Sequence, residues 1–329
     1  MMRDRMESEV DMELSFAPME GITGSIYRRV HADFFPGADV YYAPFLAPDG
    51  TGRFKGSALR DLLPENNGRI TLIPQLLVNA AEPFLAAAET LQDLGYEELN
   101  LNVGCPSGTV VVKHKGAGML GDLESLERCL DTIFSRCPQR ISVKTRLGLS
   151  STAEFPAVLA LYRRYPLARL IVHARDRAGM YQRRPDLDAF APALSGSPFP
   201  VIYNGNIFST GDYEAIVFRF PSLSGVMLGR GAVTDPALFR RIRGGPALSA
   251  AELSAFHATL LEETLASGLA PNYTVQRMKE LWFYMGCLFP GQDKALKTIL
   301  RSRCLSDYRS AVAALLDRQA PASDAVFNR

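Results

Sequence analysis

The sequence predicts an α/β protein, in which a (β/α)8 TIM barrel is followed by a small C-terminal all-helical domain. Eight short apolar runs recur between residues 14 and 230. Most of them begin about thirty residues after the previous one, which is the length of one βαβ unit. Helical patterns lie between most of the runs. After a Gly-Gly-Pro break at residues 244–246, the chain continues as helical patterns alone. Together these observations predict the barrel and its helical extension.

The predicted strands are runs of consecutive apolar residues, as expected for parallel strands buried on both faces. They begin near Leu14, Val40, Ile70, Glu98, Ile141, Leu170, Pro200 and Gly225. The longest interval, from Glu98 to Ile141, contains a loop as well as a helix. Extra length in a compact domain is usually functional, and in a barrel this loop lies on the face where active sites form.

The predicted helices carry an apolar stripe at helical spacing. Within the barrel they cover residues 81–94, 122–134, 152–162 and 209–218, with Asp122, Thr152 and Ser209 as N-caps. After the break they cover residues 250–265, 274–285, 292–303 and 306–318. The predicted domains are therefore residues 1–245, the barrel, and residues 246–329, the helical domain.

The composition is that of an ordinary soluble globular protein, with 47% hydrophobic and 22% charged residues. A net charge of +1 gives no general attraction to nucleic acid, so any basic surface must be local. The N-terminal residues lack the apolar core of a signal peptide, and no stretch approaches the roughly 20 apolar residues of a membrane span. The five cysteines and four histidines form no metal-ligand spacing, so we expect a cytoplasmic protein without a metal site.

A single thiol stands out at the exit of the fourth predicted strand. Residues 100–120 read NLNVGCPSGTVVVKHKGAGML, so Cys105 lies between a glycine and a proline and precedes a basic loop. A buried structural cysteine is the commoner fate of a free thiol. A basic loop interrupted by glycines is more typical of a positioned reactive group. The stretch alone leaves these two interpretations open.

Polar side chains end six of the predicted strands, on what would be one rim of the barrel. They are Gln75, Asn100, Asn102, Lys144, Arg146, His173, Arg175, Asn204, Asn206 and Arg230. Lysine and arginine are rarely buried without a partner. For any one of them a salt bridge or an exposed position is the simpler explanation. Six strands that end in the same way predict a shared polar or anionic ligand.

The ends of the seventh and eighth strands predict a phosphate site. Gly205 and Gly229 allow backbone N–H groups to approach a ligand, and Arg230 adds a charged donor. Loops at these positions are the usual phosphate site of such barrels. No GxGxxG follows a strand and no P-loop is present, so neither a Rossmann dinucleotide site nor a Walker nucleotide site is supported. A barrel phosphate site beside the strand-end residues Lys144 and Gln75 suits flavin mononucleotide (FMN). Lys144 could then stabilise the anionic reduced flavin.

The helical tail is basic in its middle. Residues 277–309 contain seven Lys or Arg against three acids. Lys294, Lys297 and Arg301 share one helical face. A solvated helix face is the alternative, but a basic barrel mouth nearby favours contact with a nucleic-acid backbone.

Taken together, these motifs resemble those of tRNA-dihydrouridine synthases. The matching segments are APMEGITG (17–24), NLNVGCPSG (100–108), GAG (116–118), VKTRLG (143–148), HAR (173–175), YNGNI (203–207) and MLGRGA (227–232). VQRMKELWFYM (275–285) and ALKTILRSRCLSDY (295–308) are similar to the helical domain of that family. The resemblance covers residues 14–310 in the same order.

The resemblance implies that NADPH or NADH reduces bound FMN, which then delivers hydride to C6 of a tRNA uridine. Cys105 would protonate C5, and a cysteine thiol normally stays protonated near neutral pH. Implied cofactor residues are Pro18, Met19, Gln75, Lys144, His173, Asn204, Gly205, Asn206, Gly229 and Arg230. The resemblance assigns Arg146 and Arg175 to the substrate nucleotide or phosphate. Lys113 and Lys115 lie in a basic segment that differs from the best-known members, and we expect them to neutralise tRNA phosphates. Lys294, Lys297 and Arg301 are expected tRNA contacts because of their shared helical face. Asn102 could touch the flavin or the base.

Two alternatives remain at the level of sequence. One is a small-molecule FMN barrel similar to dihydroorotate dehydrogenase, which would need no RNA-binding tail and could survive truncation near residue 245. The other is a non-catalytic RNA-binding protein that keeps the fold. The sequence leaves open the target uridine, the set of tRNAs, the choice of NADPH or NADH and the oligomeric state.

Overall fold

The barrel is closed by a strand that is interrupted in the middle. The computed structural model describes residues 12–49 and 51–323. In these residues parallel strands form one 9-stranded sheet in the order β3-β2-β1-β9-β8-β7-β6-β5-β4. The strands are β1 (Glu13–Phe16), β2 (Val40–Tyr42), β3 (Leu72–Ile73), β4 (Gln75–Leu76), β5 (Glu98–Val103), β6 (Arg140–Gly148), β7 (Leu170–Asp176), β8 (Val201–Asn204) and β9 (Gly225–Leu228).

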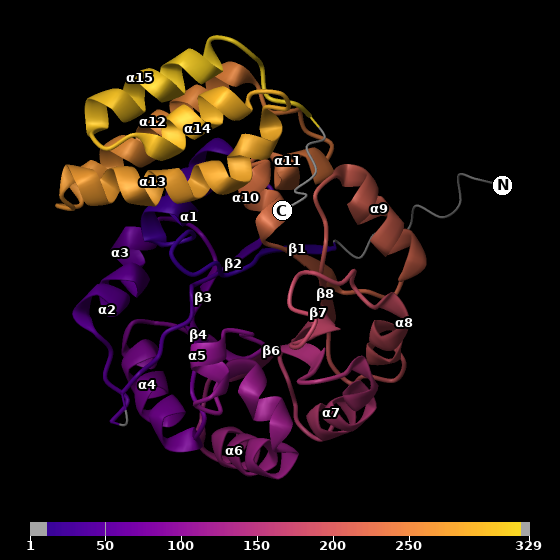
Figure 1. Ribbon diagram of the computed structural model, residues 1–329. Coiled ribbons are helices and arrows are strands. Elements are labelled where there is room, and N and C mark those ends of the chain that lie inside the picture. The colour runs from indigo at the N-terminus through magenta and orange to yellow at the C-terminus, as the bar shows by residue number, and fades with distance from the viewer. Residues whose placement is uncertain (1–11, 50, 324–329) are drawn as a thin grey trace.

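The predicted barrel is confirmed, with one correction at its third strand. The run that was expected to be one strand forms β3 and β4, which flank Pro74. Proline has no N–H to donate to the ladder, so the strand breaks there. Leu46, just after β2, bridges to Leu76 and closes the ring, with its N–H on Gln75 O at 2.7 Å. Figure 1 shows the ring of strands with helices around it.

The helices around the barrel and beyond it follow the predicted order. In the barrel part they are α1 (Ser25–Phe34), α2 (Gly56–Leu62), α3 (Pro64–Asn67), α4 (Ala81–Asp93), α5 (Gly108–Val111), η1 (Gly116–Gly121), α6 (Leu123–Arg136), η2 (Thr152–Glu154), α7 (Phe155–Tyr162), α8 (Leu187–Phe190), η3 (Ala191–Ala193), α9 (Thr210–Arg219), α10 (Arg230–Thr234) and α11 (Leu238–Ile242). The C-terminal helices are α12 (Ala250–Ala266), α13 (Pro271–Met285), η4 (Gly286–Leu288), α14 (Asp293–Arg301) and α15 (Leu305–Leu316).

Two of the three predicted N-caps are confirmed and one is wrong. Asp122 accepts the backbone N–H of Ser125, and Ser209 forms a capping box with Asp212. The predicted cap Thr152 is instead the first residue of a 3-10 turn, η2, and the cap is Ser151. Serine with a glutamate three positions later forms a reciprocal capping box, which explains the shift by one residue.

The segment after Cys105 is more ordered than a long loop. It contains the short helix α5 and the 3-10 helix η1. Gly116 starts η1 with a φ of +56°, and a Cβ there would lie 2.8 Å from the Cβ of Cys105. Glycine is therefore required at this position, both for its backbone conformation and for close packing against the thiol-bearing residue.

The strand register brings the predicted site residues together at one end of the barrel. Asn102 pairs with Lys144 across β5 and β6, and His173 pairs with Asn204 across β7 and β8. Residues two apart on a strand share a face, so Arg146 lies on the same side as Lys144. The carboxyl ends of all strands therefore present these polar groups to one mouth.

The C-terminal helices pack against the start of the barrel. Figure 1 shows α12 to α15, in orange and yellow, beside α1 and α10. Glu263 of α12 forms an ion pair with Arg29 of α1 at 2.5 Å. Phe256 and Trp282 belong to the same buried cluster as Leu14 of β1. The predicted boundary at residues 245/246 falls in the loop between α11 and α12, but the hydrophobic core continues across it, and the division into two domains stays a prediction.

Two expectations about location concern different parts of the chain. Among the described residues, no helix is both long enough and apolar enough to cross a membrane. The expected lack of a signal peptide rests on residues 1–18, of which residues 1–11 lie outside the described residues.

Candidate active site

Two adjoining cavities open at the mouth of the barrel. The first, the Arg230 cavity, has a volume of about 310 Å³. Its lining residues are Ala17, Pro18, Met19, Lys144, His173, Tyr181, Asn204, Gly205, Gly229, Arg230, Phe283 and Tyr284. The second, the Cys105 cavity, has a volume of about 250 Å³. Its lining residues are Pro18, Met19, Glu20, Phe45, Gln75, Asn102, Gly104, Cys105, Pro106, Lys144, Arg146, His173, Tyr181 and Tyr284. The shared residues make the two cavities parts of one mouth.

Basic side chains crowd this mouth. Burial and the charge of Arg146 lower the pKa of Lys144 to about 7. Burial and the charge of Arg230 lower the pKa of Arg175 to about 10, so Arg175 stays charged at neutral pH. Burial also lowers the pKa of Arg146 and of Arg230. Partly or fully buried cations that repel one another are stabilised by an anion, so the mouth suits a negatively charged ligand.

The state of His173 follows from its neighbour. Burial, together with the charges of Arg146 and Lys144, holds the pKa of His173 well below its ordinary value, so the ring is neutral at neutral pH. Its Nε2 lies 3.0 Å from the Arg175 guanidinium, which is always a donor. Nε2 must therefore accept, and the single ring proton sits on Nδ1. His173 is a neutral hydrogen-bond donor in the lining of both cavities.

Asn206 holds two of the arginines. Its Oδ1 accepts from Arg175 at 3.0 Å and from Arg230 at 2.9 Å. Asn206 is absent from the lining of both cavities. Its predicted direct contact with the cofactor stays untested, and its geometry instead favours the orientation of the two guanidinium groups.

Three hydrogen-bonded side-chain amides support the turn that carries Cys105. Asn102 Oδ1 accepts the backbone N–H groups of Gly104 at 3.0 Å and of Cys105 at 2.9 Å. Asn102 Nδ2 donates to Gln75 Oε1 at 2.7 Å, and Gln75 Nε2 donates to Asn100 Oδ1 at 2.8 Å. These amides are at most 6% exposed. Asn102 is predicted to touch the flavin or the base; in addition, it fixes the turn that carries the thiol.

Arg146 is tied to the same turn. Its Nε donates to the backbone oxygen of Gly104 at 2.9 Å, and one terminal nitrogen donates to Asp176 O at 2.9 Å. Arg146 is 1% exposed and lies in the lining of the Cys105 cavity. It therefore brings positive charge close to Cys105 while it links the ends of three strands. Its predicted contact with the substrate stays a prediction.

The sequence matches a known family over most of its length. A model of the dihydrouridine synthase family matches residues 15–272. The chain belongs to the dihydrouridine synthase family. Membership makes it an oxidoreductase, and favours the predicted synthase over the small-molecule alternative similar to dihydroorotate dehydrogenase.

Its relatives in the dihydrouridine synthase family are named for tRNA. The tRNA-dihydrouridine(16) synthase of Ralstonia nicotianae is 32% identical over 241 residues, 70% of this chain and 72% of the relative. The tRNA-dihydrouridine(16) synthase of Neisseria meningitidis serogroup A is 27% identical over 314 residues, 92% of this chain and 93% of the relative. The tRNA-dihydrouridine synthase B of Pseudomonas putida is 26% identical over 259 residues, 77% of this chain and 75% of the relative.

Solved structures confirm the barrel fold of this dihydrouridine synthase. Morphinone reductase matches with a TM-score of 0.51 at 13% identity, over 71% of this chain and 86% of its own. TcOYE with pHBA matches with a TM-score of 0.51 at 10% identity, over 70% of this chain and 88% of its own. At such identities the likeness concerns the fold alone.

The predicted substrate residues of the dihydrouridine synthase fall into two groups. Arg146, Asn102 and the predicted acid Cys105 lie in the mouth, and Arg175 borders it through His173. The others lie outside both cavities and are Lys113, Lys115, Lys294, Lys297 and Arg301. They are exposed, except for Lys115, which is partly buried. The structure therefore places these five residues on the surface and not in the lining of either cavity.

Helix α13 contributes to the mouth, which the sequence analysis missed. Phe283 and Tyr284 lie in the lining of the Arg230 cavity, and Tyr284 also lies in that of the Cys105 cavity. The sequence pattern indicates packing alone for this stretch, because WFYM reads as an apolar helix segment. Truncation near residue 245 would therefore remove part of the Arg230 cavity as well as the tail, and cannot separate a tRNA enzyme from a small-molecule enzyme.

Tyr181 is a second residue that the sequence did not reveal. It lies between β7 and α8, borders both cavities and is 48% exposed. The guanidinium carbon of Arg230 lies 4.5 Å from its ring centre and that of Arg146 lies 5.5 Å away. Its ring lies 5.8 Å from that of His173. The sequence signal that could have revealed Tyr181 is its position as an aromatic residue in the loop after a barrel strand. The face of its ring suits a planar ligand.

The sequence predicts no metal site, and the structure bears on this prediction for the described residues. Within residues 12–49 and 51–323, no cluster of three or more His, Cys, Asp or Glu side chains has an arrangement that could hold a metal ion. The expectation that this synthase needs no metal stays a prediction.

Lys144 should make the stability of the cofactor-free synthase depend on pH. Its pKa is about 7 in the folded state and about 10.4 when unfolded. Between these values the unfolded state binds more protons, so the free energy of unfolding rises with pH; below about 7 the full cost of the buried charge is present. Lys144→Met should therefore stabilise the cofactor-free protein by about 2–4 kcal/mol near pH 6, and by less near pH 9.

Urea unfolding of the cofactor-free protein at both pH values measures this difference. Lys113→Met, on an exposed lysine of the same face, is the control and should show no such gain. An equal effect of Lys144→Met at both pH values would contradict a titrating Lys144.

Proposed function

We propose that the protein is a tRNA-dihydrouridine synthase that uses FMN and NADPH or NADH to reduce the C5=C6 bond of a specific uridine. The observation that carries the proposal is the mouth itself. In a member of the dihydrouridine synthase family, Cys105 shares one cavity with Lys144, Arg146 and His173. A proton donor beside a cationic, half-apolar cavity is what reduction of a polarised double bond requires.

The donor set of the Arg230 cavity fits FMN. Arg230 supplies a charged donor for a phosphate, and Gly205 and Gly229 leave backbone groups accessible beside it. Lys144 and His173 add donors for the polar edge of a flavin ring. Lys144 Nζ keeps one bond, to Asn204 Oδ1 at 3.0 Å, which leaves further N–H groups for a ligand. An anion that binds among these cations offsets their mutual repulsion.

Flavin, once reduced, supplies the hydride for C6 of the uridine. Cys105 donates the proton to C5, so the two additions saturate the double bond, and the thiolate then regains a proton from water. Asn102 and Arg146 hold the Gly104–Cys105 turn from two sides and fix the point from which the thiol acts. Arg146 also offers positive charge to a uracil oxygen, and the Tyr181 ring lies in the lining of both cavities.

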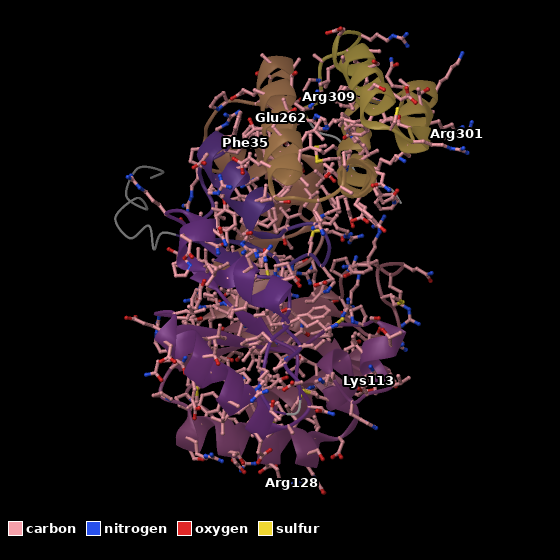
Figure 2. The ribbon with its side chains drawn as sticks, turned by 90° about the vertical axis from the view of Figure 1, so that its left-hand side faces the viewer. Phe35, Lys113, Arg128, Glu262, Arg301 and Arg309 are labelled. Carbon is pink, nitrogen blue, oxygen red and sulfur yellow. The ribbon has the colours of Figure 1, made fainter. Side chains whose placement is uncertain are left out.

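The basic residues outside the mouth suit a tRNA backbone. Lys113 and Lys115 follow the Cys105 turn, and Lys294, Lys297 and Arg301 lie on α14. Figure 2 shows Lys113 and Arg301 on the same side of the molecule, with the helical segment above the barrel. A tRNA backbone that runs along this side would have its phosphates neutralised by Lys113 and Lys115 near the mouth and by the basic residues of α14 further away, while the target base enters the mouth.

Uridine 16 is the proposed target. The relatives from Ralstonia nicotianae and Neisseria meningitidis carry this position in their names, and the second matches over 92% of this chain. The relative from Pseudomonas putida, named synthase B, is 26% identical. The longer match over the helical segment supports position 16, because that segment is proposed to set how tRNA lies on the barrel.

Purified protein should be yellow, bleach with NADPH or NADH under anaerobic conditions, and regain its colour when unmodified tRNA is added. Position-resolved mapping of dihydrouridine in tRNA, with and without the gene, should show loss at position 16. Loss at another position would overturn the proposed target while leaving the reaction intact. A protein that cannot be reconstituted with FMN, together with unchanged dihydrouridine, would overturn the proposed function.

A further inference from the structure

Helix α1 begins without an N-cap side chain of its own. The preceding residue is Gly24, in extended conformation, which cannot accept a hydrogen bond through a side chain. Instead Oδ1 of Asp61, from α2, accepts the backbone N–H of Ser25 at 2.5 Å. A Cβ on Gly24 would lie 3.2 Å from that same oxygen. Asp61 therefore fills the space in which an N-cap side chain normally lies.

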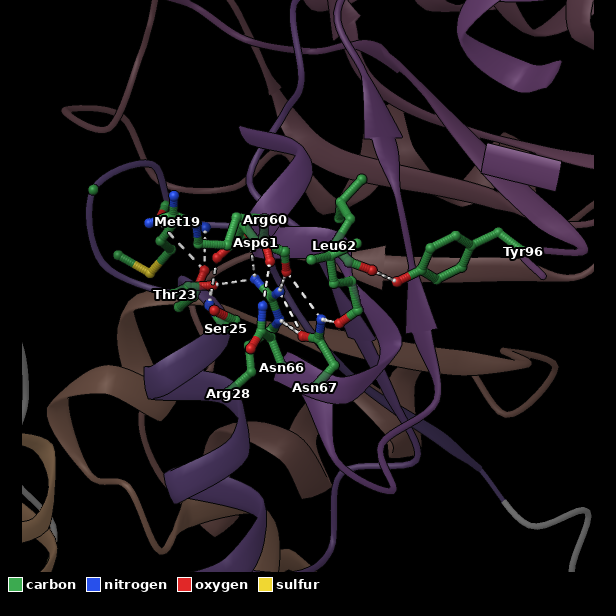
Figure 3. A network of polar contacts seen from close by, with 12 residues as sticks. Met19, Thr23, Ser25, Arg28, Arg60, Asp61, Leu62, Asn66, Asn67 and Tyr96 are labelled. Atoms are coloured by element: carbon green, nitrogen blue, oxygen red, sulfur yellow. Dashed lines mark hydrogen bonds and ion pairs between the residues drawn. The ribbon is translucent and has the colours of Figure 1, made fainter. Parts of the chain in front are cut away.

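The other oxygen of Asp61 holds a buried arginine. Oδ2 accepts from Arg28 at 3.0 Å, and Arg28 is 1% exposed. The backbone oxygen of Asp61 accepts from Arg28 at 2.8 Å, and Asn67 Oδ1 accepts from the same guanidinium at 2.7 Å. Figure 3 shows this network, which joins the start of α1 to α2 and α3. Without Asp61 the guanidinium would keep its charge but lose its counter-charge.

The same guanidinium reaches a wall of the proposed cofactor site. Arg28 donates to the backbone oxygen of Thr23 at 2.7 Å. Thr23 Oγ1 in turn accepts the N–H of Met19 at 2.9 Å, and Thr23 N–H donates to Met19 O at 3.0 Å. Pro18 and Met19 lie in the lining of both the Arg230 and the Cys105 cavities. A shift of Thr23 therefore moves Met19 and reshapes the mouth.

We infer that Asp61 is a positioning residue for cofactor binding, which sets the loop of residues 18–24 through Ser25 and Arg28; this rests on the proposed function, because FMN is taken as the ligand. Asp61 is not in the lining of either cavity of the mouth. Its effect on FMN must therefore pass through the loop. The carboxylate links helix α2, which has no other part in the site, to the wall that the cofactor meets.

Asp61→Ala should raise the Kd for FMN about tenfold and change the visible absorption of the bound flavin, because Ser25 and Arg28 lose the group that fixes Thr23 and, through it, Met19. Adding Gly24→Asp to Asp61→Ala should restore both. An aspartate at position 24 supplies an N-cap carboxylate to α1 and lies one helical turn before Arg28. Titration of the cofactor-free protein with FMN, followed by flavin fluorescence and absorption, measures both quantities.

The controls separate positioning from general stability. Asp122→Ala removes the N-cap of α6, across the ring from α1 in Figure 1, and should lower the Tm without changing the Kd for FMN. If Asp61→Ala does not fold, Asp61→Asn takes its place, because the amide keeps an acceptor for Ser25 but offers no charge to Arg28. A wild-type Kd in the Asp61 variant, or a double variant that regains Tm but not FMN affinity, would overturn the inference. Wild-type protein that binds no FMN would overturn the proposed function itself.

Discussion

Replacing Cys105 with alanine should lower the rate of dihydrouridine formation by about 10²- to 10⁴-fold, the usual contribution of a positioned general acid. Binding of FMN and its reduction by NADPH should be unchanged, because the residues of the Arg230 cavity remain in place. The Gly104–Cys105 turn should also persist, since Asn102 holds it through backbone N–H groups. Single-turnover oxidation of the reduced enzyme by unmodified tRNA measures the step directly.

Two further variants test whether the thiol proton is the cause. Cys105→Ser keeps the size of the side chain but is a far weaker acid, so it should be nearly as slow as alanine. Cys137→Ala is the matched control, because Cys137 precedes β6 at the opposite end of the barrel and should leave the rate unaltered. Product formed at the wild-type rate by the Cys105→Ala variant would remove Cys105 from the role of acid.

Replacing Arg230 with alanine should weaken FMN binding by about 2–4 kcal/mol, which corresponds to a rise in Kd of about 30- to 1000-fold. The reason is the loss of a charged donor for the phosphate. The variant also loses the hydrogen bond from the Arg230 guanidinium to Asn206 Oδ1 at 2.9 Å and the contact of its central carbon with the Tyr181 ring centre at 4.5 Å. Riboflavin has the same ring without the phosphate, so its affinity should change little. Titration with both flavins measures the difference.

The control for this variant is Arg128→Ala, on an arginine that is exposed on α6, lies in the lining of neither cavity and is labelled at the bottom of Figure 2. It should bind FMN and riboflavin as the wild type does. Equal losses of FMN and riboflavin affinity in Arg230→Ala would show that Arg230 supports the ring or the fold. In that case the phosphate site would have to lie elsewhere in the mouth.

Much of the fold could be predicted because the pattern is local. Buried parallel strands require consecutive apolar residues, and the runs near Leu99, Val143 and Ile171 show this directly. Break residues are also local: Pro74 interrupts the third strand for a reason visible in the sequence, although the prediction kept that strand whole. The predicted cap Thr152 lies one residue after the true cap for the same kind of reason, since Ser151 and Glu154 together form the capping box of η2.

The candidate site could be predicted in part for a geometric reason. Strand-end residues on parallel strands must meet at one rim, so Gln75, Lys144 and His173 were expected together, and they are. The exposed lysines of α14 and of the Cys105 segment could be placed on the surface, but nothing in their spacing fixes how a tRNA meets them. Their roles stay predictions for that reason.

The sequence by itself determined the barrel and the polar rim, including the position of Cys105 on it, because periodicity is a property of neighbouring residues. The family followed from the resemblance of its motifs. The tertiary structure decided which distant residues complete that rim. Tyr284 reaches the mouth from α13, and Asp61 caps α1 from α2. Such contacts depend on how whole helices pack, and on which side chain fills a space that a glycine leaves open. Packing of this kind is set by the shape of the folded core and leaves no regular spacing along the chain.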